Sequence, residues 1–350
     1  MESQLVGHKN LKRGITMKGS KKLNRFFSLG LAGVVILLSL AIVHEVQAEA
    51  PAENYPIDEA WEYPVKPGMD EWENYFEPEQ KLKASHVPED ILTNMTTEAL
   101  VETVLNYPLL IDMYAFDTPV LGYQAVSSIF YGLPELASRP DAVTYLNNYI
   151  EKNITEKGDT HITILYANTL IKCINDDIAS ISKAITSSIA RTRAGITYVY
   201  TPNNTPVAVY YGLTWADHDT TQAQAEAARD YYLQTYPSTE VVGPVDPEYN
   251  CHSYAWYWAS TSNPYWMNNP SAYMTDGSYY SSYCFVNAKV FYDSSWGDQY
   301  DHSGIVIEEA SYPNPCVVKS KWGCCALFTH YVDDCPYANH NPSVRCWWPS

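Results

Sequence analysis

Basic residues are scarce in this 350-residue chain, where 22 Lys and Arg stand against 40 Asp and Glu and give a formal net charge of −18. Because such an excess of negative charge repels polyanions, neither nucleic acid nor an anionic lipid surface is expected as a partner. Metal-binding signatures are also lacking. The sequence has no spaced Asp-x-Asp-x-Asp-Gly loop for calcium and no Cys-x-x-Cys pair for zinc, so no metal or other cofactor is expected.

One long hydrophobic run is present, over residues 26–43. Lys18, Lys21, Lys22 and Arg25 precede it, and Val46-Gln47-Ala48 follows as a small-residue cleavage site. This pattern predicts an export signal over residues 1–48, cut after Ala48, and an uncleaved membrane anchor is the competing reading. In either case the body is expected to be secreted or held at the cell surface, with membrane contact only through this segment. Without residues 1–48 the chain keeps 15 basic and 38 acidic residues.

Eight cysteines are present, five of them in the last 35 residues. In an oxidising compartment the cysteines of this tail are expected to form disulfides, whose pairing cannot be deduced from sequence. Cys173 lies alone in an apolar helical run and is expected in the core. A zinc site made by Cys324, Cys325, His330 and Cys335 remains a minor alternative, because the spacing is unusual for zinc.

Composition and periodicity divide the rest of the chain into three parts. Residues 49–89 carry eleven acids and six prolines without a regular period, which predicts an extended linker. Residues 90–192 show capping residues and apolar spacings of three and four, which predict an all-α module. Residues 193–350 are expected to form an α+β domain. Its expected elements are a hairpin over 196–201 and 207–211, a helix over 219–236, and strands near 239–242, 285–292, 302–308, 316–322 and 326–331.

Cys251 is the main candidate for chemistry. Asn250 is a good N-cap, and the residues after it are largely apolar and aromatic without Gly or Pro, so a helix is expected to start at Cys251. Unpaired backbone N–H groups and the helix dipole stabilise a thiolate at such a position, and the thiolate is the nucleophilic form. His302, at the start of an apolar strand-like run, is the candidate base. A disulfide at Cys251 and a merely structural His302 are the competing interpretations.

The order of these features resembles that of the NlpC-type cysteine hydrolases and the related CHAP amidases of the papain-like superfamily. The resemblance covers about residues 240–335. It depends on Cys251 at a helix start, the run Asn287-Ala288-Lys289-Val290-Phe291-Tyr292, and then Asp301-His302-Ser303-Gly304-Ile305-Val306. It implies a papain-like fold in which a Cys-bearing helix packs on a small antiparallel sheet. Cys251 would be the nucleophile and His302 the general base.

In those families a polar residue on the next strand orients the histidine. Alternation along Val318-Lys319-Ser320-Lys321-Trp322 puts Ser320 on the inward face, so Ser320 is the expected third residue and His330 the alternative. A hydroxyl supports an imidazolium less well than a carboxylate does.

The resemblance implies an exported bacterial cysteine hydrolase that cleaves amide bonds. It would be an amidase or endopeptidase acting on peptidoglycan peptides or on another peptide substrate. The alternative is a catalytically inactive secreted binding protein on a disulfide-bonded papain-like scaffold. The aromatic residues between 254 and 300 fit either a hydrophobic core or a surface that stacks on sugars.

Overall fold

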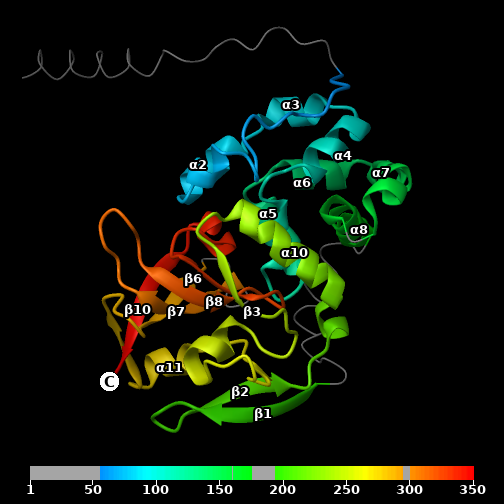
Figure 1. Ribbon diagram of the computed structural model, residues 1–350. Helices are drawn as coiled ribbons and strands as arrows, with labels where there is room; N and C mark the ends of the chain where they lie inside the picture. The colour runs from blue at the N-terminus through cyan, green and yellow to red at the C-terminus, as the bar shows by residue number, and fades with distance from the viewer. Residues whose placement is uncertain (1–55, 160, 176–193, 295–299) are drawn as a thin grey trace, which may run out of the picture. The chain divides into compact units, whose positions relative to one another are not determined.

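A computed structural model describes residues 56–159, 161–175, 194–294 and 300–350 (Figure 1). The expected export signal or anchor over residues 1–48 lies outside these ranges, as do residues 176–192 at the end of the expected all-α module. Within the described ranges, no helix is both long enough and apolar enough to span a bilayer.

Helices make up the first half of the described chain, and their starts follow the predicted caps. The Thr96 side chain accepts a hydrogen bond from the Ala99 N–H, and Thr118 does the same for Leu121, with Pro119 in the first turn. The helices are η1 (Trp72–Asn74), α2 (Pro78–Ala84), α3 (Glu89–Asn94), α4 (Thr97–Leu105), η2 (Leu110–Tyr114), α5 (Pro119–Ser127), α6 (Gly132–Ser138), α7 (Ala142–Lys157) and α8 (Ile162–Asn175).

Residues 56–89 are not the extended linker that their composition suggested. Trp72 is fully buried, and its Nε1 donates to the Thr235 carbonyl oxygen at 2.9 Å. Lys81 is also fully buried and forms an ion pair with Asp334. Aromatic side chains can be buried in tertiary contacts even when they are not regularly spaced in the sequence. The acidic, proline-containing composition of this segment therefore did not predict its structure.

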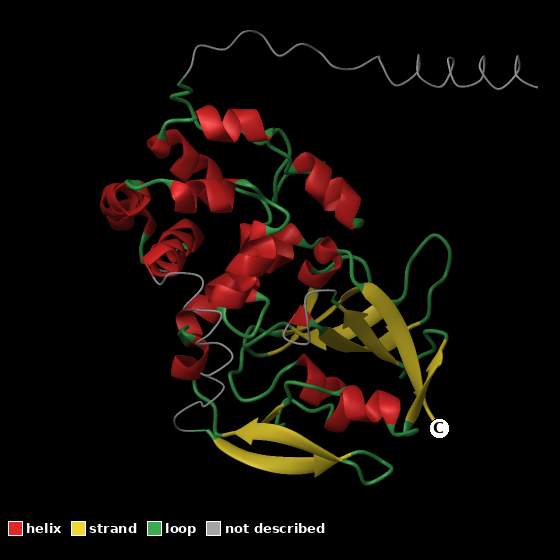
Figure 2. Cartoon of the chain, turned by 180° about the vertical axis from the view of Figure 1, so that it is seen from behind, coloured by secondary structure: helices red, strands yellow, loops and turns green. Residues whose placement is uncertain are grey.

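The strands form two antiparallel sheets, and the fold is α+β as expected. The larger sheet has the order β3-β9-β8-β7-β6-β10-β5, and the smaller has the order β1-β2-β4. Figure 2 shows the strands of both sheets in yellow. Strands β4, β5 and β10 were missed because they lie within or after loop-like sequence rich in Ser, Tyr, Asn and Pro. The strands are β1 (Gly195–Tyr200), β2 (Pro206–Tyr211), β3 (Glu240–Gly243), β4 (Tyr265–Trp266), β5 (Tyr279–Ser282), β6 (Lys289–Asp293), β7 (His302–Glu308), β8 (Val317–Lys321), β9 (Leu327–Tyr331) and β10 (Ser343–Pro349).

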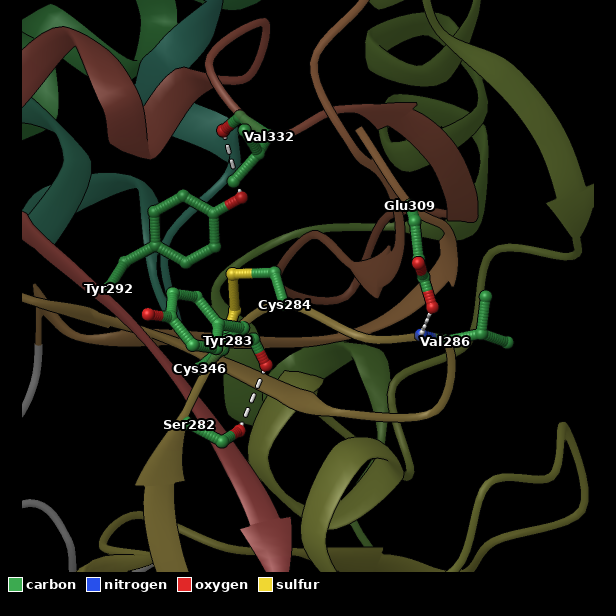
Figure 3. The surroundings of a disulfide bond; sticks show 8 residues. All are labelled: Ser282, Tyr283, Cys284, Val286, Tyr292, Glu309, Val332 and Cys346. Carbon is green, nitrogen blue, oxygen red and sulfur yellow. Dashed lines mark hydrogen bonds between the residues drawn. A yellow bond between two sulfur atoms is a disulfide. The ribbon is translucent and has the colours of Figure 1, made fainter. Parts of the chain in front are cut away.

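A disulfide between Cys284 and Cys346 fixes the edge of the larger sheet (Figure 3). Cys284 follows β5, and Cys346 lies in β10 opposite Ser282. All eight cysteines lie in the described ranges, and the other six are buried and form no disulfide. Of the five tail cysteines that were expected to form disulfides, Cys346 is bridged, to Cys284 outside the tail, and the other four are not. Cys173 is buried in α8, as predicted.

Helix α10 (Gln222–Thr235) connects the helices to the larger sheet (Figure 1). Tyr232 donates from its hydroxyl to the Ile111 carbonyl oxygen in η2 at 3.0 Å. The same ring packs edge-on against Trp322, which follows β8, with the ring centroids 4.9 Å apart. Helices α2 to α8 and the larger sheet consequently share one buried hydrophobic cluster. A smaller cluster buries Trp256 and Tyr273 together with Val199 of the hairpin, so part of the aromatic segment 254–300 is core.

Candidate active site

The helix expected at Cys251 is present, and Asn250 caps it. The Asn250 Oδ1 accepts from the Ser253 N–H at 3.1 Å, and the amide also exchanges hydrogen bonds with the backbone of Met267. The helix is short, and residues Ser253–Tyr257 form a π-helical turn (η4). Such turns recur at functional sites, and this one fixes Cys251 at the first position after the cap.

The Cys251 side chain lies against the first residues of β7. The backbone N–H groups of Ser303 and His252 point to its sulfur and favour the thiolate, as does the nearby Lys321. Burial outweighs them, because only 6% of Cys251 is exposed. Burial, and after it the nearby Asp117, raises the pKa of the Cys251 thiol to about 12. The thiolate expected from the helix start is therefore absent at neutral pH, and the group is a neutral thiol.

His302 is the first residue of β7 and is fully buried. Its ring stacks on Tyr337, with centroids 3.6 Å apart and planes 7° from parallel. Burial, followed by the nearby His330 and His252, holds the pKa of His302 well below its usual value, so the imidazole is neutral at pH 7. Neither ring nitrogen has a hydrogen-bond partner among the described residues. An unpartnered buried imidazole is costly, and such groups call for an explanation.

Ser320 lies in β8, which pairs with β7, and its side chain is buried as the alternation predicted. Its hydroxyl is 2.8 Å from the His330 Nε2 and accepts from the Trp322 Nε1 at 3.0 Å. The two candidates for the third catalytic residue thus bond to each other and not to His302. The other His330 nitrogen, Nδ1, is 2.7 Å from the Tyr331 carbonyl oxygen.

His252, next to Cys251 in the chain, is buried. Its Nδ1 is 2.7 Å from the Ser303 hydroxyl, which also accepts from the Trp256 Nε1 at 2.8 Å. The Ser303 backbone therefore faces the Cys251 sulfur while its side chain secures the η4 segment. This pair of contacts fixes the helix start to β7.

Two residues of the site were missed in the sequence because they come from distant segments. Tyr337, in η6 (Pro336–His340), stacks on His302, and Cys251 lies close enough to raise its pKa. Asp117 precedes α5, and its carboxylate accepts from the Trp266 Nε1 at 3.2 Å. The Tyr337 hydroxyl donates to the Ala115 carbonyl oxygen, so the segment 115–117 reaches the site from the helical part.

No group of three or more His, Cys, Asp or Glu residues that could hold a metal ion occurs within the described ranges. No protein-family model, curated protein or solved structure matches this chain.

Proposed function

We propose that this chain is an exported bacterial cysteine hydrolase of the papain-like NlpC/CHAP type, which cleaves amide bonds in cell-wall peptides. One observation carries the proposal: the Ser303 backbone N–H faces the Cys251 sulfur, and the residue next to Ser303 in the chain is His302. The Cys251 thiol therefore lies beside the backbone that carries His302, but no hydrogen bond joins its sulfur to the imidazole, so the proposed proton transfer requires the two side chains to close on each other. A Cys-bearing helix on an antiparallel sheet is the arrangement that the resemblance implies.

The protonation states define how such a site would work. Both groups are neutral at pH 7, so His302 would take the thiol proton as Cys251 attacks the amide carbonyl. The imidazolium would then give this proton to the leaving amine, and water would hydrolyse the thioester. Backbone N–H groups at the helix start would stabilise the oxyanion.

Stacking would orient the base in place of a hydrogen bond. The face of the Tyr337 ring covers the His302 imidazole, and Tyr337 is itself held by the Ala115 carbonyl oxygen. Ser320 bonds to His330, and the nearby His330 helps to lower the pKa of His302. Tyr337 is thus the residue that positions His302 in the proposed mechanism. Ser320 does not orient His302 through a hydrogen bond.

The test is cleavage of purified peptidoglycan by the full chain, with the released peptides identified by mass spectrometry. Cys251→Ala and His302→Ala are each expected to reduce the rate at least about 10³-fold, because each removes a group that acts in bond breaking. Cys173→Ala is the matched control, since it removes a buried thiol from α8, and it should retain activity. Cleavage that survives in Cys251→Ala would refute the mechanism.

The burial of the site favours a second candidate, a catalytically inactive secreted binding protein on the same scaffold. Cys251 is 6% exposed and His302 is fully buried, so a peptide reaches the sulfur only if the site opens. A folded chain that binds peptidoglycan but releases no peptide, in wild type and Cys251→Ala alike, would establish this alternative.

A further inference from the structure

A groove of about 680 Å³ lies on the side of α10 toward the helical region. One wall is a stripe on α10, made by Ala227, Asp230, Tyr231 and Gln234. The spacing of three and four residues puts these side chains on one helix face. The volume falls within the range of roughly 300–1,000 Å³ typical of small-molecule sites.

The opposite wall is the extended arm that contains Trp61 and Tyr63, and hydrogen bonds fix this arm in place. The Trp61 backbone N–H donates to the Thr103 hydroxyl at 2.8 Å, and the Tyr63 hydroxyl donates to the Thr103 carbonyl oxygen at 3.2 Å. Before the groove, Ile57 exchanges backbone hydrogen bonds with Asn94 and Thr96 at 2.9 Å. The wall is therefore preformed.

The ends of α7 and α8 close the groove with polar groups. The Lys157 Nζ donates to the Tyr149 hydroxyl at 3.0 Å. His161 accepts at Nδ1 from the Thr163 N–H at 3.3 Å, which leaves its proton on Nε2. Burial, and then Lys157, lowers the pKa of His161, so its ring is neutral at pH 7. His161 therefore adds a donor to the groove without adding charge.

The charges that line the groove cancel. Lys66 and Lys157 stand against Glu62 and Asp230, and Asp230 is also paired with the neighbouring Arg229 at 2.7 Å, in a chain whose net charge is −18. A balanced site gains nothing from an anionic or a cationic ligand. Its amides, carboxylates and ammonium groups instead supply both donors and acceptors, as hydroxyl groups require.

Flat aromatic surface completes the lining. Trp61 comes from the arm and Tyr231 from α10, and each ring is partly buried against the core, so part of each ring remains to line the groove. An indole or phenol ring offers an apolar face beside a polar edge, which suits the mixed surface of a sugar ring.

We propose that this groove binds an uncharged oligosaccharide. The groove lies apart from Cys251 and His302, neither of which lines it, so the inference stands or fails independently of the proposed hydrolase activity. In a cell-wall hydrolase, it would hold the glycan to which the peptides are attached.

The experiment is calorimetric titration of the full chain carrying Cys251→Ala, which excludes turnover, with the tetramer of N-acetylglucosamine as the probe. Saturable binding is expected, with a Kd between about 10 µM and 1 mM. Trp61→Ala and Gln234→Ala should each weaken it about tenfold, because they alter opposite walls. Gln234 is exposed, so its replacement leaves the core intact.

Trp258→Ala is the matched control, because Trp258 is 45% exposed and does not line the groove. It should leave the Kd unchanged, and tetragalacturonate, an anionic tetramer, should bind more weakly than the neutral probe. The proposal is overturned by an absence of binding at about 10 mM, by tighter binding of the anionic tetramer, or by Trp61→Ala and Gln234→Ala proteins that bind like wild type.

Discussion

Lys81 and Asp334 form an ion pair in which neither side chain is exposed, although 253 residues separate them in the chain. The Lys81 ammonium also donates to the Tyr75 carbonyl oxygen, and Asp334 accepts from the Ser238 N–H at 2.8 Å. The pair thus joins α2 to the segments that follow α10 and β9.

Removing one partner of this pair should be strongly destabilising. Lys81→Met leaves the Asp334 carboxylate buried without its cation, and we expect the free energy of unfolding to fall by about 3–5 kcal/mol in urea titration. Lys172→Met is the matched control, because it breaks an ion pair whose side chains are 45% and 50% exposed, and it should cost less than about 1 kcal/mol. An equally small decrease in the free energy of unfolding in both variants would contradict the burial of the Lys81–Asp334 pair.

Asp112 should make stability depend on pH. Its carboxylate accepts from the Tyr236 hydroxyl at 2.5 Å and from the Asn339 amide at 2.9 Å. Burial nevertheless raises its pKa to about 7, against the lowering effect of these bonds and of Lys81. The folded state therefore binds a proton that the unfolded state has lost, and the Asp112 contribution falls as pH rises from about 4 to about 7, by about 1.4 kcal/mol per pH unit.

Asp112→Asn isolates this contribution, because an amide keeps the shape and does not titrate. The variant should lose the decline between pH 4 and 7 that wild type shows in urea midpoints, while Asp219→Asn, at a half-exposed carboxylate, should keep it. Wild-type and Asp112→Asn curves that run parallel across this range would refute the assignment.

The neutral state of Cys251 predicts slow alkylation. With a thiol pKa of about 12, the rate of iodoacetamide modification at position 251 should be far below that of a free cysteine at pH 7 and should rise about tenfold per pH unit. Mass spectrometry of the peptide containing Cys251 measures this rate. Modification that is already fast at pH 6 and does not speed up at higher pH would instead indicate that Cys251 rests as a thiolate.

The Cys284–Cys346 bridge closes a 62-residue separation, and Cys284→Ser should lower the free energy of unfolding by about 2–5 kcal/mol. Reduction of wild type should cause a similar loss. Thiol titration of the unreduced protein in denaturant should count the six remaining cysteines, and a count of fewer than six would reveal further bridges.

Gly304 is expected to be a packing requirement of the β7–β8 pair. A Cβ at this position would lie 2.3 Å from the Val318 Cγ1. Gly304→Ala should therefore cost about 1–3 kcal/mol in thermal or urea unfolding, and Val318→Ala should cost less in the Gly304→Ala background than in wild type. Strictly additive losses would show that the two side chains do not compete for the same space.

Much of the fold was predictable because its signals are local. Thr96, Thr118 and Asn250 cap the helices that follow them, and the hairpin and the strands around His302 and Ser320 lie where alternation put them. The linker prediction over residues 49–89 was wrong for residues 56–89, because composition does not report contacts such as that of Trp72 with Thr235.

The sequence by itself determined the secondary structure around the site, including the capped helix at Cys251, the strand that begins at His302 and the inward face of Ser320. Only the tertiary structure decided their chemical states and partners. Burial raises the pKa of Cys251 and lowers that of His302, Tyr337 stacks on the imidazole, and Ser320 bonds to His330. The physical reason is that capping and alternation act over a few residues, whereas desolvation depends on every segment that excludes water from the site.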